Sequence, residues 1–368
     1  MARVAFISRM DERNVRLAKL LATVAPRSEC VLVGWSRFDE DWAPGAVSWQ
    51  REILRQPTGE GLLTARHLPG FLDHVERALR KHRADLVVAI NDEVGWLAGR
   101  YKGKLFGSLV LDLEDELEAR VRTRNPLLKA ALRWVAEAAR AAADRILSVD
   151  ARRLELLSAE HRRKAVVVPN YPRDAGPALW RRLPQGPARV FVGGALARTR
   201  GLPTVLRAAG GAGVGIVSAG RLMDSYAAEV FVRSPLVSYV GCLRPEEALE
   251  AMAGCDLAVA LYEPGPQINR LAAPNKVYDA LCVGRPILVN REMDLSRWIE
   301  EQQIGFAAPY GDVETIGRIF SSLPARRAGL ASFAARARRL FDQGYSWKAC
   351  EPVVLSALEQ ALAAGRGA

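Results

Sequence analysis

The sequence predicts an α/β protein with two Rossmann-like domains that face a central cleft. Short apolar runs alternate with amphipathic stretches along most of the chain, and a proline-rich segment interrupts this alternation near the middle. The length of 368 residues also exceeds what one ordinary domain core holds. Alternating strands and helices are typical of doubly wound parallel sheets, whose ligands bind beyond the carboxyl ends of the strands.

The first half contains apolar runs with the length and composition of buried parallel strands. These runs are residues 4–8, 31–35, 86–90, 107–111, 145–149 and 166–169. Between them, three amphipathic stretches predict helices at residues 14–24, 68–82 and 127–143.

Residues 169–190 hold five prolines and little periodicity, which favours a linker. After it we expect strands at 190–192, 215–219, 237–240, 257–261 and 286–290, and helices at 202–209, at 245–253 and after Pro274. The predicted domains are residues 1–175 and 176–346. A terminal helix over 347–363, within a third segment of residues 347–368, is expected to pack back on the first domain.

The formal net charge of +11 favours an anionic partner, namely nucleic acid, anionic lipid or a phosphorylated small molecule. The excess is spread over both halves, which argues against a dedicated nucleic-acid arm. Five scattered cysteines and four histidines show no metal-ligand spacing, so we expect no metal site. Without a signal peptide or a spanning apolar run, the prediction is a cytoplasmic protein, at most peripheral to the membrane.

The stretch FVGGALARTRGLPTVLRAA, residues 191–209, has the features of a phosphate-binding turn. Gly193 and Gly194 permit a close approach of the backbone, the helix that follows offers a partial positive charge, and Arg198 or Arg200 adds a full one. An ordinary turn between strand and helix remains the alternative. The glycines of GGAGVG, residues 210–215, instead follow a helix and precede a strand, so they predict a helix end and not a dinucleotide fingerprint.

Lys276 and Asp279 stand three residues apart at the start of the helix that follows Pro274. Such a pair is usually a solvated surface feature. Here the helix lies between two predicted strands, so its start points to the edge where a ligand binds. An ammonium at this edge can meet a phosphate, while a carboxylate accepts hydrogen bonds from ribose hydroxyls.

Acidic residues follow the strand over 107–111 in the first domain: Asp112, Glu114, Asp115 and Glu116. They could hold a metal, act as a base or orient sugar hydroxyls, and Asp112-Leu113-Glu114 is similar to the D-x-D motif of other transferases. For Glu116 and Glu118, an acidic first turn that complements a helix dipole is an equal alternative. Asn91, Asp92 and Glu93 follow another strand in the same manner.

The stretch PNKVYDALCVGRPIL, residues 274–288, resembles the nucleotide-sugar segment of GT-B glycosyltransferases, particularly family 4. Supporting similarities are VLDLEDE, ADRILSVDARRLELL, VVVPNYP, FVGGALARTRGL, YVGCLRPEEALEAMAGCDLAVALY and GYSW, which run over nearly the whole chain. The resemblance implies transfer of a sugar from a nucleotide diphosphate-sugar to an acceptor hydroxyl, with retention and with no required cofactor or metal.

The resemblance assigns Arg200 and Lys276 to the donor phosphates and Asp279 to the ribose. Gly193 and Gly194 match the loop under the donor. The other donor-binding candidates from the matching stretches are Arg198, Gly220, Cys242, Glu263 and Asn275, and the catalytic candidates are Asp112, Glu114 and Lys276.

The chain also departs from the family pattern. Gly194 replaces an arginine of many relatives, and Glu114 replaces a commonly functional histidine. Leu271 stands where relatives have the first of two acidic residues, and Glu263 is a candidate substitute.

The expected role is synthesis of a surface polysaccharide or lipid-linked glycan at the cytoplasmic membrane face. The expected partners are a nucleotide sugar, a glycan or lipid-linked acceptor, and an anionic membrane contacted through basic, Trp-bearing helices such as 127–143. Acceptor specificity is expected in loops such as 35–68. The alternatives are a catalytically silent binding or scaffold protein of the same fold, and a basic nucleic-acid binder, whose retention on DNA would depend strongly on salt.

Overall fold

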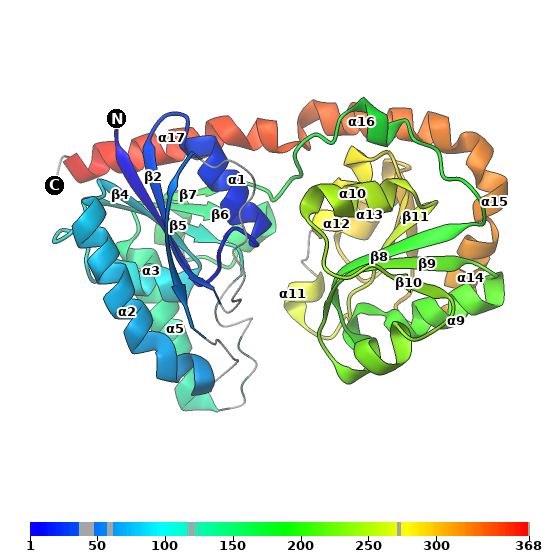
Figure 1. Cartoon of the computed structure of the whole chain (residues 1–368), viewed down its shortest axis with the longest axis horizontal. Coiled ribbons are helices and arrows are strands. Elements are labelled where there is room, and N and C mark those ends of the chain that lie inside the picture. The colour runs from blue at the N-terminus through cyan, green and yellow to red at the C-terminus, as the bar shows by residue number, and fades with distance from the viewer. Residues whose placement is uncertain are drawn as a thin grey trace. The chain divides into compact units, whose positions relative to one another are not determined.

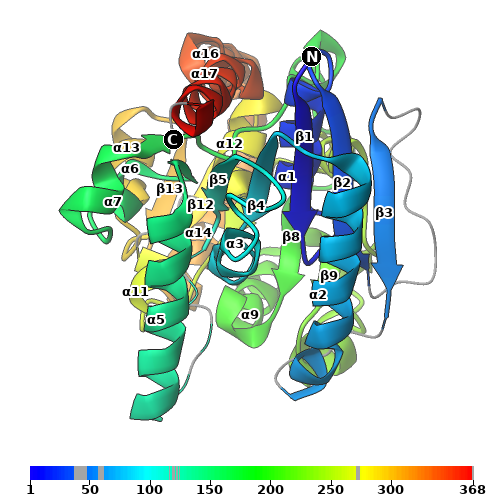
Figure 2. The ribbon, with the colours of Figure 1, turned by 90° about the vertical axis from the view of Figure 1, so that its left-hand side faces the viewer.

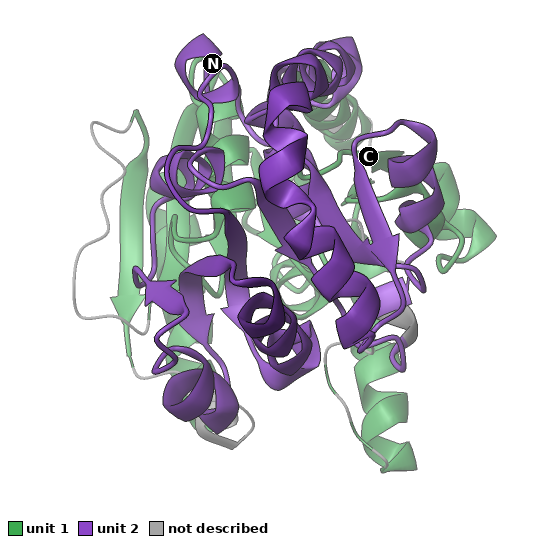
Figure 3. Ribbon diagram, turned by 90° about the vertical axis from the view of Figure 1, so that its right-hand side faces the viewer, with its two compact units in different colours: residues 1–170, 350–368 green, residues 171–349 purple. Residues whose placement is uncertain are grey.

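The computed structural model describes residues 1–36, 48–56, 62–115, 117, 121, 123, 125–270 and 274–366. It divides into two compact units (Figure 3). Unit 1 comprises Met1–Asn170 and Cys350–Ala368, and unit 2 comprises Tyr171–Ala349. No helix in the described part of the chain combines the length and the apolarity needed to cross a membrane.

Unit 1 is built on a seven-stranded parallel sheet of order β3-β2-β1-β4-β5-β6-β7. Strands β2, β4, β5, β6 and β7 of this sheet are labelled in Figure 1. Its strands are β1 (Arg3–Ser8), β2 (Glu29–Ser36), β3 (Gln50–Arg55), β4 (Leu86–Ile90), β5 (Ser108–Leu113), β6 (Arg145–Ser148) and β7 (Ala165–Val167). Its helices are α1 (Val15–Val24), α2 (Leu62–His82), α3 (Asp92–Gly99), α5 (Pro126–Ala142), α6 (Ala151–Leu154) and α7 (Ala159–Arg163). Strand β4 is buried along its whole length, as expected for a parallel sheet covered on both faces.

Unit 2 is built on a six-stranded parallel sheet of order β10-β9-β8-β11-β12-β13. Its strands are β8 (Arg189–Leu196), β9 (Gly215–Leu222), β10 (Val237–Tyr239), β11 (Leu257–Ala260), β12 (Ile287–Asn290) and β13 (Gly305–Ala308). Its α-helices are α8 (Pro177–Trp180), α9 (Leu202–Ala212), α10 (Pro245–Ala253), α11 (Gln267–Arg270), α12 (Asn275–Cys282), α13 (Leu295–Glu301), α14 (Val313–Ser321), α15 (Leu323–Arg326) and α16 (Leu330–Gly344).

Successive residues of the unit 2 strands pack into two different apolar clusters. Val190 and Val192 belong to one cluster and Phe191 to the other. This alternation arises because neighbouring side chains of a strand point to opposite faces. The sheet of unit 2 therefore has a packed core on each face.

The structure contains each strand and helix that the sequence predicts. It also adds one edge strand to each sheet, β3 in unit 1 and β13 in unit 2. Strand β3 has the sequence QREILR and is at most half-buried, so it lacks the apolar run of a central strand. Strand β13 has only four residues, GFAA. Helix α9 runs to Ala212, and Gly213 ends it with φ of 66°, which confirms the helix-end interpretation of the GGAGVG stretch.

The C-terminal helix α17 (Trp347–Arg366) belongs to unit 1 from Cys350 onward. The Cys350 thiol contacts the Pro169 carbonyl at 3.5 Å. Near the end of the helix, a Cβ added to Gly365 would lie 3.2 Å from the Gly107 carbonyl oxygen. The expectation that the terminal helix packs back on the first domain is therefore confirmed.

Candidate functional site

Three glycines of unit 2 meet where β8, β9 and β10 end. Gly194 and Gly220 are register partners, and the Gly220 N–H donates to the Gly241 carbonyl at 2.8 Å. Gly194 has φ of 94° and Gly220 has φ of 136°, and a Cβ on Gly220 would lie 1.9 Å from the Gly194 carbonyl oxygen. Only glycine fits such a contact, so the strand ends present a floor of bare backbone.

The ammonium of Lys276 lies directly over this floor. Lys276 is the second residue of α12, and its Nζ is 2.6 Å from the point where a Cβ on Gly194 would stand. At the neighbouring position, a Cβ on Gly193 would lie 2.7 Å from the Phe191 ring. The structure thus brings Gly193, Gly194 and Lys276 together, as the sequence predicts.

Arg200 lies beside the same floor, at the end of the short 3₁₀ turn Arg198–Arg200 that connects β8 to α9. Its guanidinium carbon is 3.9 Å from the centre of the Tyr262 ring. Its Nη1 atom is buried and has no hydrogen-bond partner among the described residues. Because buried donors in proteins are nearly always paired, this atom indicates a missing acceptor.

A cavity of about 60 Å³ connects these groups. Gly193, Arg200, Tyr262 and Lys276 line it together with apolar residues, namely Val192, Ala195, Leu196, Val259, Ala260 and Leu261. Within the described ranges, neither Arg200 nor Lys276 has an acidic partner at ion-pair distance. Two cations that converge on one small cavity fit an anion, and phosphate oxygens are the acceptors that guanidinium and ammonium groups commonly bind.

The other donor-side candidates do not line this cavity. The guanidinium of Arg198 turns toward the Tyr226 ring, 5.3 Å away, and the Glu263 N–H donates to the Thr199 carbonyl at 3.0 Å. Cys242 is exposed beyond Gly241. Asn275 is exposed, Asp279 is half-buried one helical turn beyond Lys276, and Leu271 lies outside the described residues.

A buried asparagine that the sequence analysis missed supports the cavity wall. Asn290 ends β12, and its Oδ1 accepts from the Tyr262 N–H at 2.8 Å. Its Nδ2 donates to Glu292 at 3.0 Å, and the Glu292 carboxylate also accepts from the Tyr310 N–H. The sequence contained a signal for this residue, because Asn290 is the polar end of an otherwise apolar strand and ligands bind at the carboxyl ends of such strands.

A larger cavity, about 540 Å³, lies at the amino ends of the unit 2 strands. Its lining includes Asp256, Pro286 and Gly305, which stand where β11, β12 and β13 begin. None of the predicted site residues lines it. Parallel sheets bind their ligands at the carboxyl ends of the strands, so the smaller cavity is the better candidate site.

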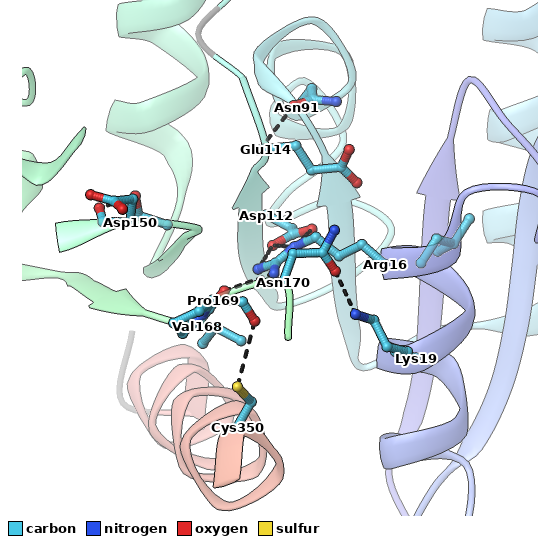
Figure 4. Close-up of polar contacts among 12 residues, drawn as sticks. Arg16, Lys19, Asn91, Asp112, Glu114, Asp150, Val168, Pro169, Asn170 and Cys350 are labelled. Atoms are coloured by element: carbon cyan, nitrogen blue, oxygen red, sulfur yellow. Dashed lines mark hydrogen bonds and ion pairs between the residues drawn. The ribbon is translucent and has the colours of Figure 1, made fainter. Parts of the chain in front are cut away.

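In unit 1 a buried ion pair lies at the end of β5 (Figure 4). Asp112 is fully buried, and the Arg16 guanidinium donates to its carboxylate from Nε at 2.9 Å and from Nη2 at 2.6 Å. Arg16 Nη1 also donates to the Val168 carbonyl at 2.7 Å. The Asp112 carboxylate therefore has a protein partner, Arg16. This pairing favours a role for Asp112 in positioning neighbouring groups over direct contact with a substrate.

Glu114 has a different environment two residues further on. Its carboxylate accepts from Asn14 Nδ2 at 2.8 Å, while Asn14 Oδ1 caps the start of α1. Burial of the carboxyl group and the nearby charge of Asp112 raise the pKa of Glu114 to about 7. Burial and a like charge both disfavour the ionised carboxylate, so this side chain exchanges a proton near neutral pH.

The polar residues after β4 hold this loop in place. Asn91, with φ of 69°, accepts from the backbone N–H of Glu114 at 3.1 Å and of Asp115 at 3.2 Å. Asp92 is fully buried and is bound by Arg140 of α5 at 2.9 Å. Glu116 and Glu118 lie outside the described residues. The described part of the chain has no group of three metal-binding side chains.

Neither a family model nor a curated protein matches the chain. Solved structures, however, match it over nearly its whole length. The sucrose-phosphate synthase of Thermosynechococcus elongatus aligns with 99% of this chain and 100% of its own, with a TM-score of 0.72 and 14% identity. The chain has the GT-B glycosyltransferase fold.

Two further structures also match over nearly their whole length. Anabaena HepE in complex with UDP-glucose covers 98% of this chain and 100% of its own, with a TM-score of 0.71 and 15% identity. WaaG, a glycosyltransferase involved in lipopolysaccharide biosynthesis, covers 95% and 98%, with a TM-score of 0.65 and 15% identity. This fold is therefore shared with nucleotide-sugar glycosyltransferases, whose chemistry lies in the side chains grafted on it.

Proposed function

We propose that the chain is a retaining glycosyltransferase. It moves a sugar from a nucleotide diphosphate-sugar to a hydroxyl of a glycan or lipid-linked acceptor, in surface polysaccharide or glycoconjugate biosynthesis. The observation that carries the proposal is that Lys276 and Arg200 line one cavity together with Gly193, while the buried Nη1 of Arg200 has no hydrogen-bond partner among the described residues. A diphosphate supplies the anionic oxygens that both cations lack.

On the donor side, the proposal assigns residues 176–346 to the nucleotide sugar. Lys276 and Arg200 bind the diphosphate, and the starts of α9 and α12 add partial positive charge. Asp279 binds the ribose hydroxyls. The nucleoside lies along the strand ends near Gly220 and Cys242.

The proposed reaction breaks the bond between the anomeric carbon and the phosphate oxygen, and the electron pair leaves with the nucleoside diphosphate. The acceptor oxygen bonds to the anomeric carbon on the same face, and its proton passes to the departing phosphate. Lys276 and Arg200 are already in place where negative charge develops, which is the most effective form of electrostatic stabilisation. No metal or other cofactor is part of this proposal.

On the acceptor side, the proposal assigns residues 1–175, with the segment 347–368 packed on them. Glu114 orients the acceptor hydroxyl, and Asp112 acts through Glu114 by raising its pKa. We place the reaction at the cytoplasmic face of a membrane with anionic lipids, and nucleic acid is no partner.

The test is a thermal-unfolding screen with UDP-, GDP-, TDP- and ADP-sugars, because a ligand that binds the folded state raises the melting temperature. Transfer of a radiolabelled sugar from the hit to membrane extract then tests the reaction. Lys276→Met should abolish both signals, while Lys348→Met, an exposed lysine on α17, should keep them. The proposal is overturned if no nucleotide sugar shifts the melting temperature and none is transferred or hydrolysed.

Glu114 at a family histidine position motivates the alternative of a catalytically silent GT-B protein. That alternative predicts that Lys276→Ala and Asp279→Ala leave the biological activity intact. Loss of activity in both variants, with the melting temperature of the free protein unchanged, would exclude it.

A further inference from the structure

The cavity of about 540 Å³ at the amino ends of the unit 2 strands has the volume of a small-molecule site. All of its lining residues belong to unit 2. Helices α13 and α16 and strand β13, which contribute to the lining, are labelled in Figure 2. Strand β11 begins just after Asp256, which lines this cavity, and ends at Ala260, which lines the smaller one beside Lys276. The two cavities therefore lie at opposite ends of one strand and are separate sites.

Apolar side chains form much of this lining. They are Pro286, Phe306, Leu323, Ala325, Leu330 and Phe333. A guanidinium lies over each of the two rings: that of Arg326 is 5.0 Å from the centre of the Phe306 ring, and that of Arg336 is 5.6 Å from the centre of the Phe333 ring. Such a lining fits a ligand with an apolar body, because binding removes apolar surface from water.

The two arginines of the lining have no acidic partner in the described part of the chain. Arg326 donates from Nε to the Ser322 hydroxyl at 2.8 Å. The Nε atom of Arg336 is buried and finds no hydrogen-bond partner among the described residues. Because buried donors are nearly always paired, Arg336 indicates an acceptor that the described chain does not supply.

The acidic residues of the lining do not neutralise both arginines. Asp256 is buried, and its carboxylate already accepts from Arg327 Nη2 at 2.8 Å and from the Arg189 N–H at 2.9 Å. Glu300 is exposed near the end of α13. Two guanidinium groups against one available carboxylate leave the lining with net positive charge, which attracts an anion.

We propose that this cavity binds a small organic anion. Arg326 and Arg336 hold its phosphate or carboxylate group, to which guanidinium groups donate paired hydrogen bonds. Its apolar body lies against Phe306 and Phe333. An inorganic anion is a less suitable ligand, because it would leave these rings in contact with water. The inference goes beyond the proposed function, since it assigns unit 2 a second ligand that is neither the sugar donor nor the acceptor.

The test is a titration of the full chain with phenyl phosphate, followed by ligand-observed NMR. The protein carries Lys276→Met, which removes the ammonium of the donor cavity and so weakens competing binding there. We expect saturable binding of phenyl phosphate, and several-fold weaker binding of inorganic phosphate and of benzyl alcohol. Adding Arg336→Met should weaken phenyl phosphate about tenfold, because it removes a charged hydrogen-bond donor.

Two further variants control for charge and for folding. Arg339→Met removes an exposed arginine of α16 that does not line the cavity, so it should leave the affinity unchanged. Ala325→Trp, at an exposed position of the lining, occupies part of the cavity without changing a charge and should also weaken phenyl phosphate. Thermal unfolding of each variant checks that it remains folded.

The inference is overturned if phenyl phosphate does not bind, or if it binds the Arg336→Met and Ala325→Trp variants as tightly as their parent. Equal affinity for inorganic phosphate would also overturn it, because the apolar lining would then contribute nothing. In the chain that keeps Lys276, Arg336→Met should preserve the melting-temperature shift caused by nucleotide sugars. Failure of the proposed function would remove that shift and leave the binding of phenyl phosphate intact.

Discussion

The ammonium of Lys276 occupies the space that a side chain on Gly194 would need. The two groups come from different elements, the start of α12 and the end of β8. In the sequence, Gly194 looks like the loss of an arginine that the resembled family often carries. In this structure the missing side chain of Gly194 leaves room for the ammonium of Lys276.

Gly194→Ala should therefore weaken nucleotide binding more than it weakens the fold. The new Cβ would lie 2.6 Å from Nζ, so the lysine must swing away from the cavity. The positive φ of 94° adds a cost of about 1–2 kcal/mol to folding. We expect roughly tenfold weaker binding of the nucleoside diphosphate, which isothermal titration calorimetry would measure, in a protein that still unfolds cooperatively.

Gly211→Ala is the matched control for that substitution. Gly211 lies in α9, and a Cβ there meets nothing within 4 Å. Alanine is favoured over glycine in a helix by up to about 1 kcal/mol, so this variant should be slightly more stable and bind the nucleotide as wild type does. Equal binding by both variants would contradict the role given to Lys276.

Arg200→Met should separate ligand binding from stability. The Nη1 atom of Arg200 is buried and has no hydrogen-bond partner in the described part of the chain, and the guanidinium stacks on Tyr262. Removing an unpaired buried donor is favourable, while the lost stacking costs about 0.5–1 kcal/mol. The melting temperature of the free protein should change little, and the shift caused by a nucleoside diphosphate should largely disappear. A large loss of stability without ligand would indicate a structural arginine instead.

The fold was predictable from the sequence because most strands are buried on both faces and read as apolar runs. Strand β3 escaped prediction because a half-buried edge strand can be polar. In the candidate site, residue types and strand ends led to Lys276, Arg200 and Gly194. Their geometry depended on contacts between residues distant in sequence, such as the stacking of Arg200 on Tyr262.

The role of Asp112 shows the same limit in unit 1. A carboxylate at the end of a strand suggests catalysis, yet its guanidinium partner, Arg16, stands 96 residues earlier. Arg16 stands on the apolar face of its predicted helix, which indicates that it is buried. A buried arginine needs a partner, so this position was the available signal for the ion pair. Neither pattern identifies the other residue of the pair.

Removing one partner of the Arg16–Asp112 pair should lower the free energy of unfolding far more than removing one partner of an exposed ion pair. Arg16→Met leaves the Asp112 carboxylate buried without its partner, for an expected loss of about 3–5 kcal/mol of unfolding free energy. Arg318→Met, which removes the exposed pair with Glu314, should cost under about 1 kcal/mol. Urea denaturation measures both, and adding Asp112→Asn to Arg16→Met should recover part of the loss.

Glu114→Gln should change how stability depends on pH. The pKa of Glu114 is about 7 in the folded protein, against an ordinary value of 4.5. As pH rises between these values, the unfolded chain loses this proton while the folded chain keeps it, so the contribution of Glu114 to stability falls. Glutamine keeps the oxygen that accepts from Asn14 and has no proton to lose. The variant should therefore be more stable than wild type at pH 8, and this advantage should shrink toward pH 5.

Thermal unfolding at pH 5, 6, 7 and 8 measures this difference for Glu114→Gln. Glu359→Gln, on the exposed side of α17, is the control for removing one carboxylate at the surface. If transfer activity is found, its rise near pH 7 should also vanish in Glu114→Gln, because the ionised carboxylate is the form that accepts a hydrogen bond from an acceptor hydroxyl. A constant stability difference across the pH range would show that Glu114 does not titrate there.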